Sequence, residues 1–210
     1  IAVWGRNEAK NAEAVAELVA MGGHAQSFEA DVTDPASTAA AFDRTINAFG
    51  KIDSCFANAG GAGARGAFVD MDRQAWLDTN ELNILSVIDT FQLATRHWQN
   101  RKAGGKLIVT SSVAALLGLP NSAGYCLTKS AVTGLVRSLA IELGRSGIQV
   151  NAILPGFIET EMSLNTPKAF QDGCRRRAAS GKIGQLSDME GIAVYLASKQ
   201  SNFMTGQALV

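Results

Sequence analysis

The chain has 210 residues, 47% hydrophobic and 18% charged, which suits one ordinary globular domain with a sizeable core. Nineteen basic residues balance nineteen acidic ones, so no global field recruits nucleic acid or an anionic membrane, and no apolar run is long enough to span a bilayer. Three widely spaced cysteines and two isolated histidines predict neither a disulfide framework nor a metal site. Such cysteines are typical of reduced thiols in a cytoplasmic protein.

Strand-like and helix-like segments alternate along the chain without a linker or an internal repeat. In chain order, the expected strands are residues 1–4, 25–29, 54–57, 106–110 and 150–154, and the expected helices are residues 7–21, 35–49, 73–101, 122–144 and a last one opening near 187. Asp34 caps the second helix and Pro35 takes its first position, where the missing amide costs nothing. This alternation predicts an α/β fold with a doubly wound parallel sheet.

Tyr125 and Lys129 form a Tyr-x-x-x-Lys pentad, and Ser112 lies thirteen residues before the tyrosine. Residues four apart on a helix share one face, so both side chains can point at the same spot. A phenol is a poor acid or base near neutrality because its ordinary pKa is about 10, and a nearby ammonium is expected to lower that pKa. Such a phenol can exchange a proton while a carbonyl and an alcohol interconvert, with Ser112 hydrogen-bonding the same oxygen. The alternative is a chance pentad, because this pattern is common in helices.

Each candidate element follows the end of a predicted strand. Asn58-Ala59-Gly60 follows the strand at 54–57, Ser112 follows the strand at 106–110, and Pro155-Gly156 follows the strand at 150–154. Open parallel sheets bind their ligands in the crevice beyond the carboxyl ends of the strands. All three segments therefore lie where such a fold carries its site.

These pieces together resemble the short-chain dehydrogenase/reductase family, in its branch with a catalytic tetrad. The matching residues follow the family's order and spacing over essentially the whole chain: Asn58-Ala59-Gly60, Asn83 seven residues after Trp76, Ser112, Tyr125 with Lys129, and Pro155-Gly156-x-Ile158-x-Thr160. The resemblance implies a single Rossmann-type NAD(P)-binding domain over residues 1–210 and reversible hydride transfer between a nicotinamide cofactor and a carbonyl or secondary alcohol. Within the family, the chain is similar to 3-oxoacyl-ACP reductases and to gluconate or glucose dehydrogenases.

The resemblance assigns a role to each tetrad residue. Tyr125 is the proton donor or acceptor, and Lys129 lowers its pKa and holds the nicotinamide ribose. Ser112 orients the substrate oxygen and stabilises developing charge. Asn83 holds a proton-relay water near Lys129; the alternative is an interior helix asparagine bonded to backbone.

The resemblance also implies a set of cofactor contacts. Asp31 and Val32 match the pair that flanks the adenine, Asn58, Ala59 and Gly60 match the adenosine side, and Pro155, Gly156, Ile158 and Thr160 match the segment beside the nicotinamide. Each segment has a simpler interpretation as well. Residues 31–34 can be only a turn and a helix cap, and Pro155-Gly156 can be only a turn.

The strand at residues 1–4 matches the family's second strand, and the residues that follow it bear on the choice of cofactor. NAD-preferring dehydrogenases often place an acidic residue there to bind the adenosine ribose, whereas this chain has Gly5 followed by Arg6. A guanidinium can pair with a 2′-phosphate bidentately, so NADP(H) is favoured and NAD(H) stays possible. The alternative is that Arg6 is simply a solvent-exposed residue at a helix start.

The family's first strand and its Thr-Gly-x-x-x-Gly-x-Gly turn have no counterpart in this sequence. The glycine-rich run from Gly60 to Gly63 follows a later strand and opens no matching helix, so it is not a substitute. Because the family's first strand is central, its loss would leave unpaired sheet edges. We therefore expect residues 1–210 to be a portion of a longer chain.

Two other functions stay open: a catalytically silent nucleotide-binding or regulatory homologue, and a chain that acts only as an interaction partner. The substrate is a small carbonyl or alcohol compound that the sequence does not specify further. Its lid is expected over residues 161–184, with Met162, Leu164 and Phe170 as apolar wall candidates and Arg175 to Arg177 as possible anion contacts.

By resemblance, the helices at 73–101 and 122–144 pair across a two-fold axis. Ile88, Phe91 and Leu135 add apolar area beyond the stripe that faces the sheet. A homo-oligomer is expected, most simply a homotetramer with dimer symmetry, and a thick monomeric core is the alternative.

Overall fold

A computed structural model describes all residues from 1 to 210. The strands are β1 (Ala2–Gly5), β2 (Gln26–Glu29), β3 (Ser54–Ala57), β4 (Gly105–Thr110), β5 (Ile148–Ile153) and β6 (Ala208–Leu209). The helices are α1 (Glu8–Ala20), α2 (Pro35–Phe49), α3 (Arg73–Asn80), α4 (Ser86–Asn100), α5 (Ala123–Leu143), α6 (Glu161–Leu164), α7 (Lys168–Arg177) and α8 (Glu190–Ala197). The predicted alternation of strands and helices is confirmed.

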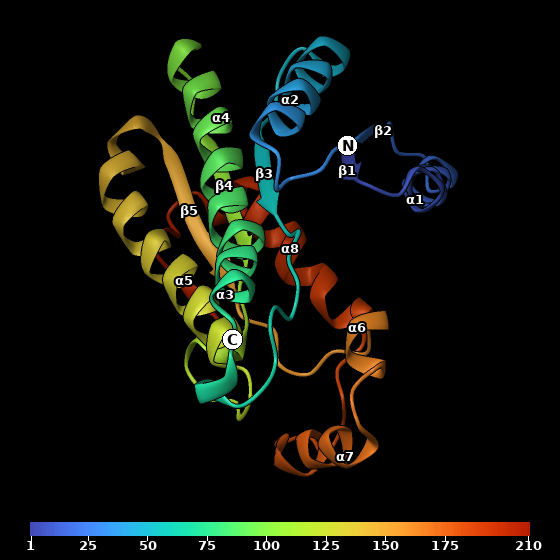
Figure 1. Ribbon diagram of the computed structural model, residues 1–210. Helices are drawn as coiled ribbons and strands as arrows, with labels where there is room; N and C mark the ends of the chain where they lie inside the picture. Colours follow the sequence, from blue (N-terminus) through green and yellow to red (C-terminus); the bar gives the residue numbers. More distant parts are fainter.

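Every strand pairing is parallel, as the sequence predicts for an α/β fold. The strands form two sheets, β1-β2 and β3-β4-β5-β6, and β1 does not pair with β3. In Figure 1 the β1-β2 pair lies with α1 to one side of the larger sheet. Trp4 attaches β1 to α2, because its indole Nε1 donates to Thr45 Oγ1 at 2.9 Å and its ring meets Phe42 edge-on at 6.3 Å.

The larger sheet is covered on both faces. Alternate residues of β4 point to opposite sides, so Leu107 and Val109 join the main core with α4 and α5, while Ile108 packs with Leu196 of α8 on the other side. Trp98 of α4 lies in the main core, and its Nε1 donates to the Ile52 carbonyl at 2.7 Å. This two-sided cover is the layer arrangement of a doubly wound fold.

The predicted single helix over 73–101 is wrong in one respect. Its middle, Glu81–Leu85, is a π-helical turn between α3 and α4, closed by the bond from the Ser86 amide to the Glu81 carbonyl. One extra residue in this turn shifts the face that the following residues present, and such bulges are frequent at functional sites. Asn83 lies inside it.

Two further expectations are corrected at the level of packing. Phe91 is 2% exposed and belongs to the main core, so it adds no outer apolar area, whereas Ile88 and Leu135 are half-buried. The last helix begins at Glu190 and follows a 3-10 turn over Leu186–Met189. None of the helices has the length and apolar character required to cross a membrane.

Candidate active site

Tyr125 and Lys129 lie in the first turns of α5, as predicted. The Lys129 Nζ lies 5.8 Å from the centroid of the Tyr125 ring. Lys129 is 6% exposed, and its Nζ donates to the Thr110 carbonyl at 2.7 Å, at the carboxyl end of β4. Helix geometry thus brings the ammonium and the phenol together against the strand end.

The Lys129 ammonium is a buried charge without a carboxylate partner. Burial lowers the pKa of Lys129 to about 8. None of the ion pairs in the structure involves this residue. A cation in this state stabilises any negative charge or hydroxyl that enters beside it.

Ser112 lies directly after β4 and caps the short 3-10 helix Val113–Ala115, accepting a hydrogen bond from the Ala114 amide at 3.1 Å. That short helix packs against α5, and Ser130 of α5 donates to the Ala115 carbonyl at 3.1 Å. Ser112 is half-buried. It therefore lies at the carboxyl end of β4, at the start of a short helix that packs against α5.

Asn83 is 1% exposed and all of its side-chain polar atoms are bonded. Its Oδ1 accepts from the Gly61 amide at 2.9 Å, and its Nδ2 donates to the Gly61 carbonyl at 2.9 Å and to Thr128 Oγ1 at 3.2 Å. The side chain therefore ties the loop after β3 to α5. Backbone bonding, the alternative kept open for this residue, accounts for part of its environment but not for the bond to Thr128.

Buried hydroxyl groups that the sequence interpretation missed hold this arrangement. Thr128 is fully buried and donates to the Tyr125 carbonyl at 3.0 Å while it accepts from Asn83. Ser111 and Thr133 both donate to the Lys129 carbonyl, at 2.9 and 2.8 Å. Thr128 lies inside the pentad and Ser111 adjoins Ser112, so closeness to the candidate catalytic residues was the one signal in the sequence that could have indicated their role.

The segment after β3 reaches the same centre. Asn58 Oδ1 accepts from Thr110 Oγ1 at 2.8 Å, which joins the ends of β3 and β4. A Cβ on Gly60 would lie 3.1 Å from Asn83 Oδ1 and 3.5 Å from Lys129 Nζ. Glycine at this position keeps the approach to the ammonium open.

The ends of β1 and β2 bring together the other predicted cofactor residues. Arg6 Nη1 lies 3.8 Å from Asp31 Oδ2, and the arginine side chain is 75% exposed. Hydrogen bonds from the Thr33 hydroxyl and amide, together with the charge of Arg6, lower the pKa of Asp31. Asp31 thus forms a turn with Thr33, in agreement with the simpler interpretation of residues 31–34. Half-buried Val32 follows it. These residues lie in the β1-β2 sheet and not with the tetrad.

The segment after β5 connects the centre to the expected lid. The Pro155 carbonyl accepts from the Val113 amide at 3.1 Å, next to exposed Gly156, and Ile158 bridges to Gly184. Thr160 caps α6 in a capping box with Ser163. The segment 161–184, where the lid is expected, contains α6 and α7.

Two side-chain contacts connect this lid with its surroundings. Phe170 of α7 meets Phe157 edge-on at 5.8 Å. At the other side, Lys10 of α1 forms an ion pair with Glu161 of α6 at 2.7 Å. This exposed pair is the polar contact between the β1-β2 unit and the lid.

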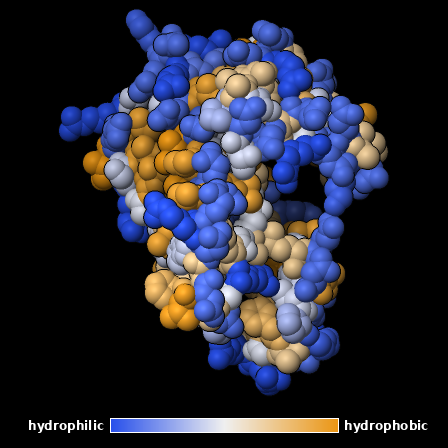
Figure 2. Space-filling model, in the orientation of Figure 1, coloured by the Kyte–Doolittle hydropathy of each residue, from blue (hydrophilic) through white to orange (hydrophobic).

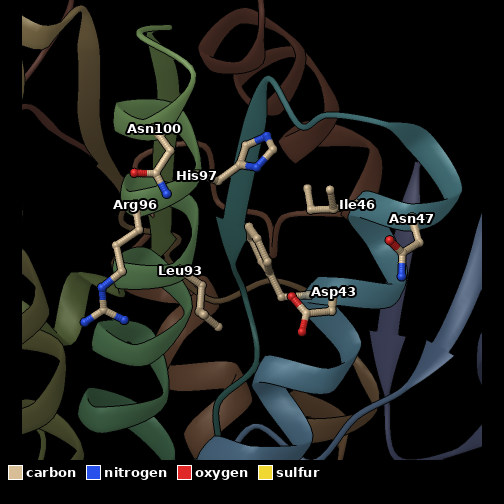
Figure 3. Close-up of a pocket in the computed structure, with 8 residues that line it drawn as sticks. Asp43, Ile46, Asn47, Leu93, Arg96, His97 and Asn100 are labelled. Carbon is tan, nitrogen blue, oxygen red and sulfur yellow. The ribbon is translucent and has the colours of Figure 1, made fainter.

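A cavity of about 480 Å³ lies elsewhere, between α2 and α4 (Figure 3). Phe42, Ile46 and Leu93 form its apolar wall, and polar side chains including Asp43 and His97 surround them. The lining includes none of the tetrad residues and no strand end. We therefore assign the chemistry to the strand ends and not to this cavity.

Comparisons with known proteins agree with this geometry. Residues 1–210 match the family model described as enoyl-(acyl carrier protein) reductase. L-rhamnose 1-dehydrogenase (NAD(P)(+)) of Azotobacter vinelandii is 34% identical over 196 residues, covering 92% of this chain and 76% of that protein. Gluconate 5-dehydrogenase of Gluconobacter oxydans is 34% identical over 211 residues, covering 98% of this chain and 80% of that protein.

A solved structure shares the architecture. The gluconate 5-dehydrogenase from Burkholderia cenocepacia J2315, in complex with NADP and tartrate, superposes with a TM-score of 0.91 at 33% identity. The match covers 100% of this chain and 82% of that one.

Proposed function

The chain belongs to the short-chain dehydrogenase/reductase family and is an NAD(P)-dependent oxidoreductase that interconverts carbonyl and secondary alcohol groups; on that premise we propose that Asn83, Ser112, Tyr125 and Lys129 form its catalytic centre. The observation that carries this proposal is the buried, unpaired ammonium of Lys129 beside the Tyr125 ring. A lysine with no functional role at this position would only destabilise the folded protein, because burial disfavours its charged form.

The proposed roles follow from the position of each side chain. In the oxidative direction, the Tyr125 phenolate accepts the alcohol proton while the carbon loses a hydride; in the reductive direction, the phenol returns that proton to the carbonyl oxygen. Lys129 stabilises the phenolate by charge attraction. Ser112 donates a hydrogen bond to the reacting oxygen, and Asn83 holds the loop after β3 against α5. A bound nicotinamide supplies or accepts the hydride.

The donor set at the strand ends fits a dinucleotide. Buried Lys129 can donate to ribose hydroxyls, and Gly60 leaves the approach to it open. Arg6 and Asp31 offer a charged pair at the β1-β2 end. The remaining proposed contacts are Val32, Asn58, Ala59, Pro155, Gly156, Ile158 and Thr160. Of these, Thr160 already uses both its hydroxyl and its backbone amide in the capping box with Ser163.

For the cofactor preference we propose NADP(H) over NAD(H). Arg6 supports it, because its exposed guanidinium has only a 3.8 Å contact with Asp31 and can turn toward a 2′-phosphate.

Replacing Tyr125 by phenylalanine tests the catalytic assignment. The change removes only the hydroxyl, so we expect cofactor affinity to stay within twofold while kcat falls by about 10²- to 10⁴-fold. Cys126→Ser, at the next position of the same turn, is the matched control. Retention of most activity in Tyr125→Phe would refute the assignment. A silent nucleotide-binding homologue is the second candidate, and it would bind the cofactor and turn over no substrate in either form.

We also propose a homo-oligomer built on α4 and α5, with a tetramer as its full form. In Figure 2 apolar residues gather over the side where these helices lie. Leu85, Leu127 and Ile141 are 44%, 48% and 85% exposed, which is apolar area that no other part of the chain covers. Light scattering at micromolar concentration tests this proposal, and a single-subunit mass would contradict it.

A further inference from the structure

The glycine-rich loop after β3 begins with the proposed cofactor contacts Ala59 and Gly60, and the rest of it has no role in the chemistry described so far. Its sequence over residues 59–67 is Ala-Gly-Gly-Ala-Gly-Ala-Arg-Gly-Ala. Arg65 is the only residue in this run whose side chain extends beyond a methyl group. The composition therefore lets the backbone pass close to its neighbours while it presents one guanidinium.

The loop follows the edge of the reaction centre. At its start, Gly60 lies beside Lys129, and the Gly61 amide and carbonyl are held by Asn83. At its end, the Gly66 amide donates to the Asn121 carbonyl at 3.1 Å, four residues before Tyr125. In Figure 1 this segment descends from the end of β3 alongside α3. Arg65, adjacent to Gly66, therefore lies in the part of the loop that borders the start of α5, the helix that carries Tyr125 and Lys129.

The loop backbone is fixed in this position. The Ala64 amide donates to Thr79 Oγ1 at 3.1 Å. Gly63 has a φ of +62°, and a Cβ there would lie 2.4 Å from Thr79 Cγ2, so only glycine allows this approach. Arg65 is thus carried between two bonded residues, Ala64 and Gly66, and little backbone ordering remains to oppose binding by its side chain.

The guanidinium of Arg65 is free. It is exposed and forms no ion pair, whereas Lys10 pairs with Glu161, and Lys168 and Arg175 pair with Asp172. Arg176, Arg177 and Lys182 of the segment 161–184 also form no ion pair, but none of them lies in the loop that starts beside Lys129. A guanidinium presents a planar fork of donors that matches a carboxylate bidentately.

We propose that Arg65 binds a carboxylate of the substrate, so that the substrate class is a hydroxy acid and its oxo acid. This inference rests on the proposed function and deepens it. The reacting carbon lies at Tyr125 and Ser112, and the carboxylate lies toward the Gly66 end of the loop. A phosphate would offer the same fork-binding chemistry, so the experiment must separate the two anions.

The test compares substrates that differ only in the anionic group: gluconate with glucitol, 4-hydroxycyclohexanecarboxylate with its carboxamide, and glucitol 6-phosphate as the phosphate arm. The variants are Arg65→Gln and Arg65→Lys. The matched control is Arg101→Gln at the end of α4, which removes the same charge beside the Gly50 carbonyl, before the amino end of β3. Initial rates give kcat/KM, and calorimetry of gluconate and glucitol gives affinity without turnover.

We expect Arg65→Gln to lower kcat/KM for the carboxylates by about tenfold to hundredfold and to change the neutral partners by less than twofold. Arg65→Lys should fall between, because it keeps the charge and loses the fork. The control should match the wild type. Affinity for gluconate should fall in parallel with kcat/KM.

Equal effects of Arg65→Gln on acids and neutral partners, or no effect on either, would overturn the subsite and leave the proposed function intact. A loss confined to glucitol 6-phosphate would overturn the carboxylate assignment. Absence of turnover with every alcohol in the panel, by a wild type that binds the cofactor, would overturn the proposed function and this inference with it.

Discussion

Replacing Lys129 by methionine should make the protein more stable and inactive. The folded state lowers the pKa of this lysine to about 8 from an ordinary value of about 10.4. At about 1.4 kcal/mol per pKa unit, the buried charge costs the folded state about 3 kcal/mol at pH 7. Methionine has a similar shape, avoids this cost and loses the bond to the Thr110 carbonyl, worth about 1 kcal/mol. The free energy of unfolding should therefore rise by about 2 kcal/mol.

The pH dependence gives this prediction its sign. The unfolded chain holds the Lys129 proton up to about pH 10.4, whereas the folded chain releases it near pH 8. Between these values the unfolded state binds more protons, so this group makes wild-type stability rise with pH by about 3 kcal/mol. At pH 7 the variant should be the more stable protein, and near pH 10.5 it should be the less stable by about 1 kcal/mol, the lost hydrogen bond.

Urea unfolding of the cofactor-free proteins at pH 7 and near pH 10.5 measures this difference, and initial rates measure activity. Lys106→Met is the matched control: Lys106 is 7% exposed, burial lowers its pKa, and its Nζ bonds only Ser201 and Asn202, far from the tetrad. That variant should keep its kcat. A Lys129→Met protein that is less stable than the wild type at pH 7, or whose stability follows pH in parallel with it, would refute the reasoning.

Three other outcomes follow from particular contacts. Arg6→Asp should invert the cofactor preference, changing the ratio of kcat/KM for NADP and NAD by about tenfold to hundredfold, and an unchanged ratio would mean that Arg6 is not the determinant. Burial and the charge of Arg101 lower the pKa of His97. As the pH drops below about 6.5 the unfolded state takes up the proton first, so the free energy of unfolding should fall. His97→Gln should weaken this loss in urea titrations, and exposed His24→Gln is the control. Gly105→Ala places a Cβ 2.2 Å from the Trp98 ring and should lower the free energy of unfolding by about 1–3 kcal/mol in the same assay. Gly191→Ala, whose Cβ would have no atom within 4 Å, should not lower it. Equal stabilities of the two variants would contradict the packing argument.

Local signals in the sequence predicted local structure well. Pro35 and Asp34 define the start of α2, and the left-handed Gly50 ends it, so its bounds are confirmed at Pro35 and Phe49. The short buried strand β3 is likewise confirmed at Ser54–Ala57. These elements are specified by residues within a few positions of their ends, and tertiary contacts did not override them.

The misses depend on contacts between distant segments. The π-helical turn at Glu81–Leu85 interrupts a segment with helical periodicity, and no glycine or proline marks it. Its extra residue places Asn83 where it bonds Gly61 and Thr128, which are 22 and 45 residues away. These bonds are tertiary contacts that no periodicity contains. Phe91 is a different case: it lies on the regular α4 stripe with Val87, Ala94 and Trp98, so the periodicity of α4 itself indicated its place in the core.

The tetrad shows how far a motif constrains geometry. Helix pitch alone places Tyr125 and Lys129 on one face, but it does not bury the lysine or remove acidic neighbours from it. Burial comes from β4, where Thr110 accepts from Nζ, and from Ser111 and Thr133, which hold the Lys129 carbonyl. This fold surrounds the ammonium with hydroxyls and carbonyls and leaves it without a carboxylate. The buried charge lowers the stability of the folded state, and it stays available to a phenolate. The physical feature that weakens this part of the fold is therefore the same one that suits it for proton transfer.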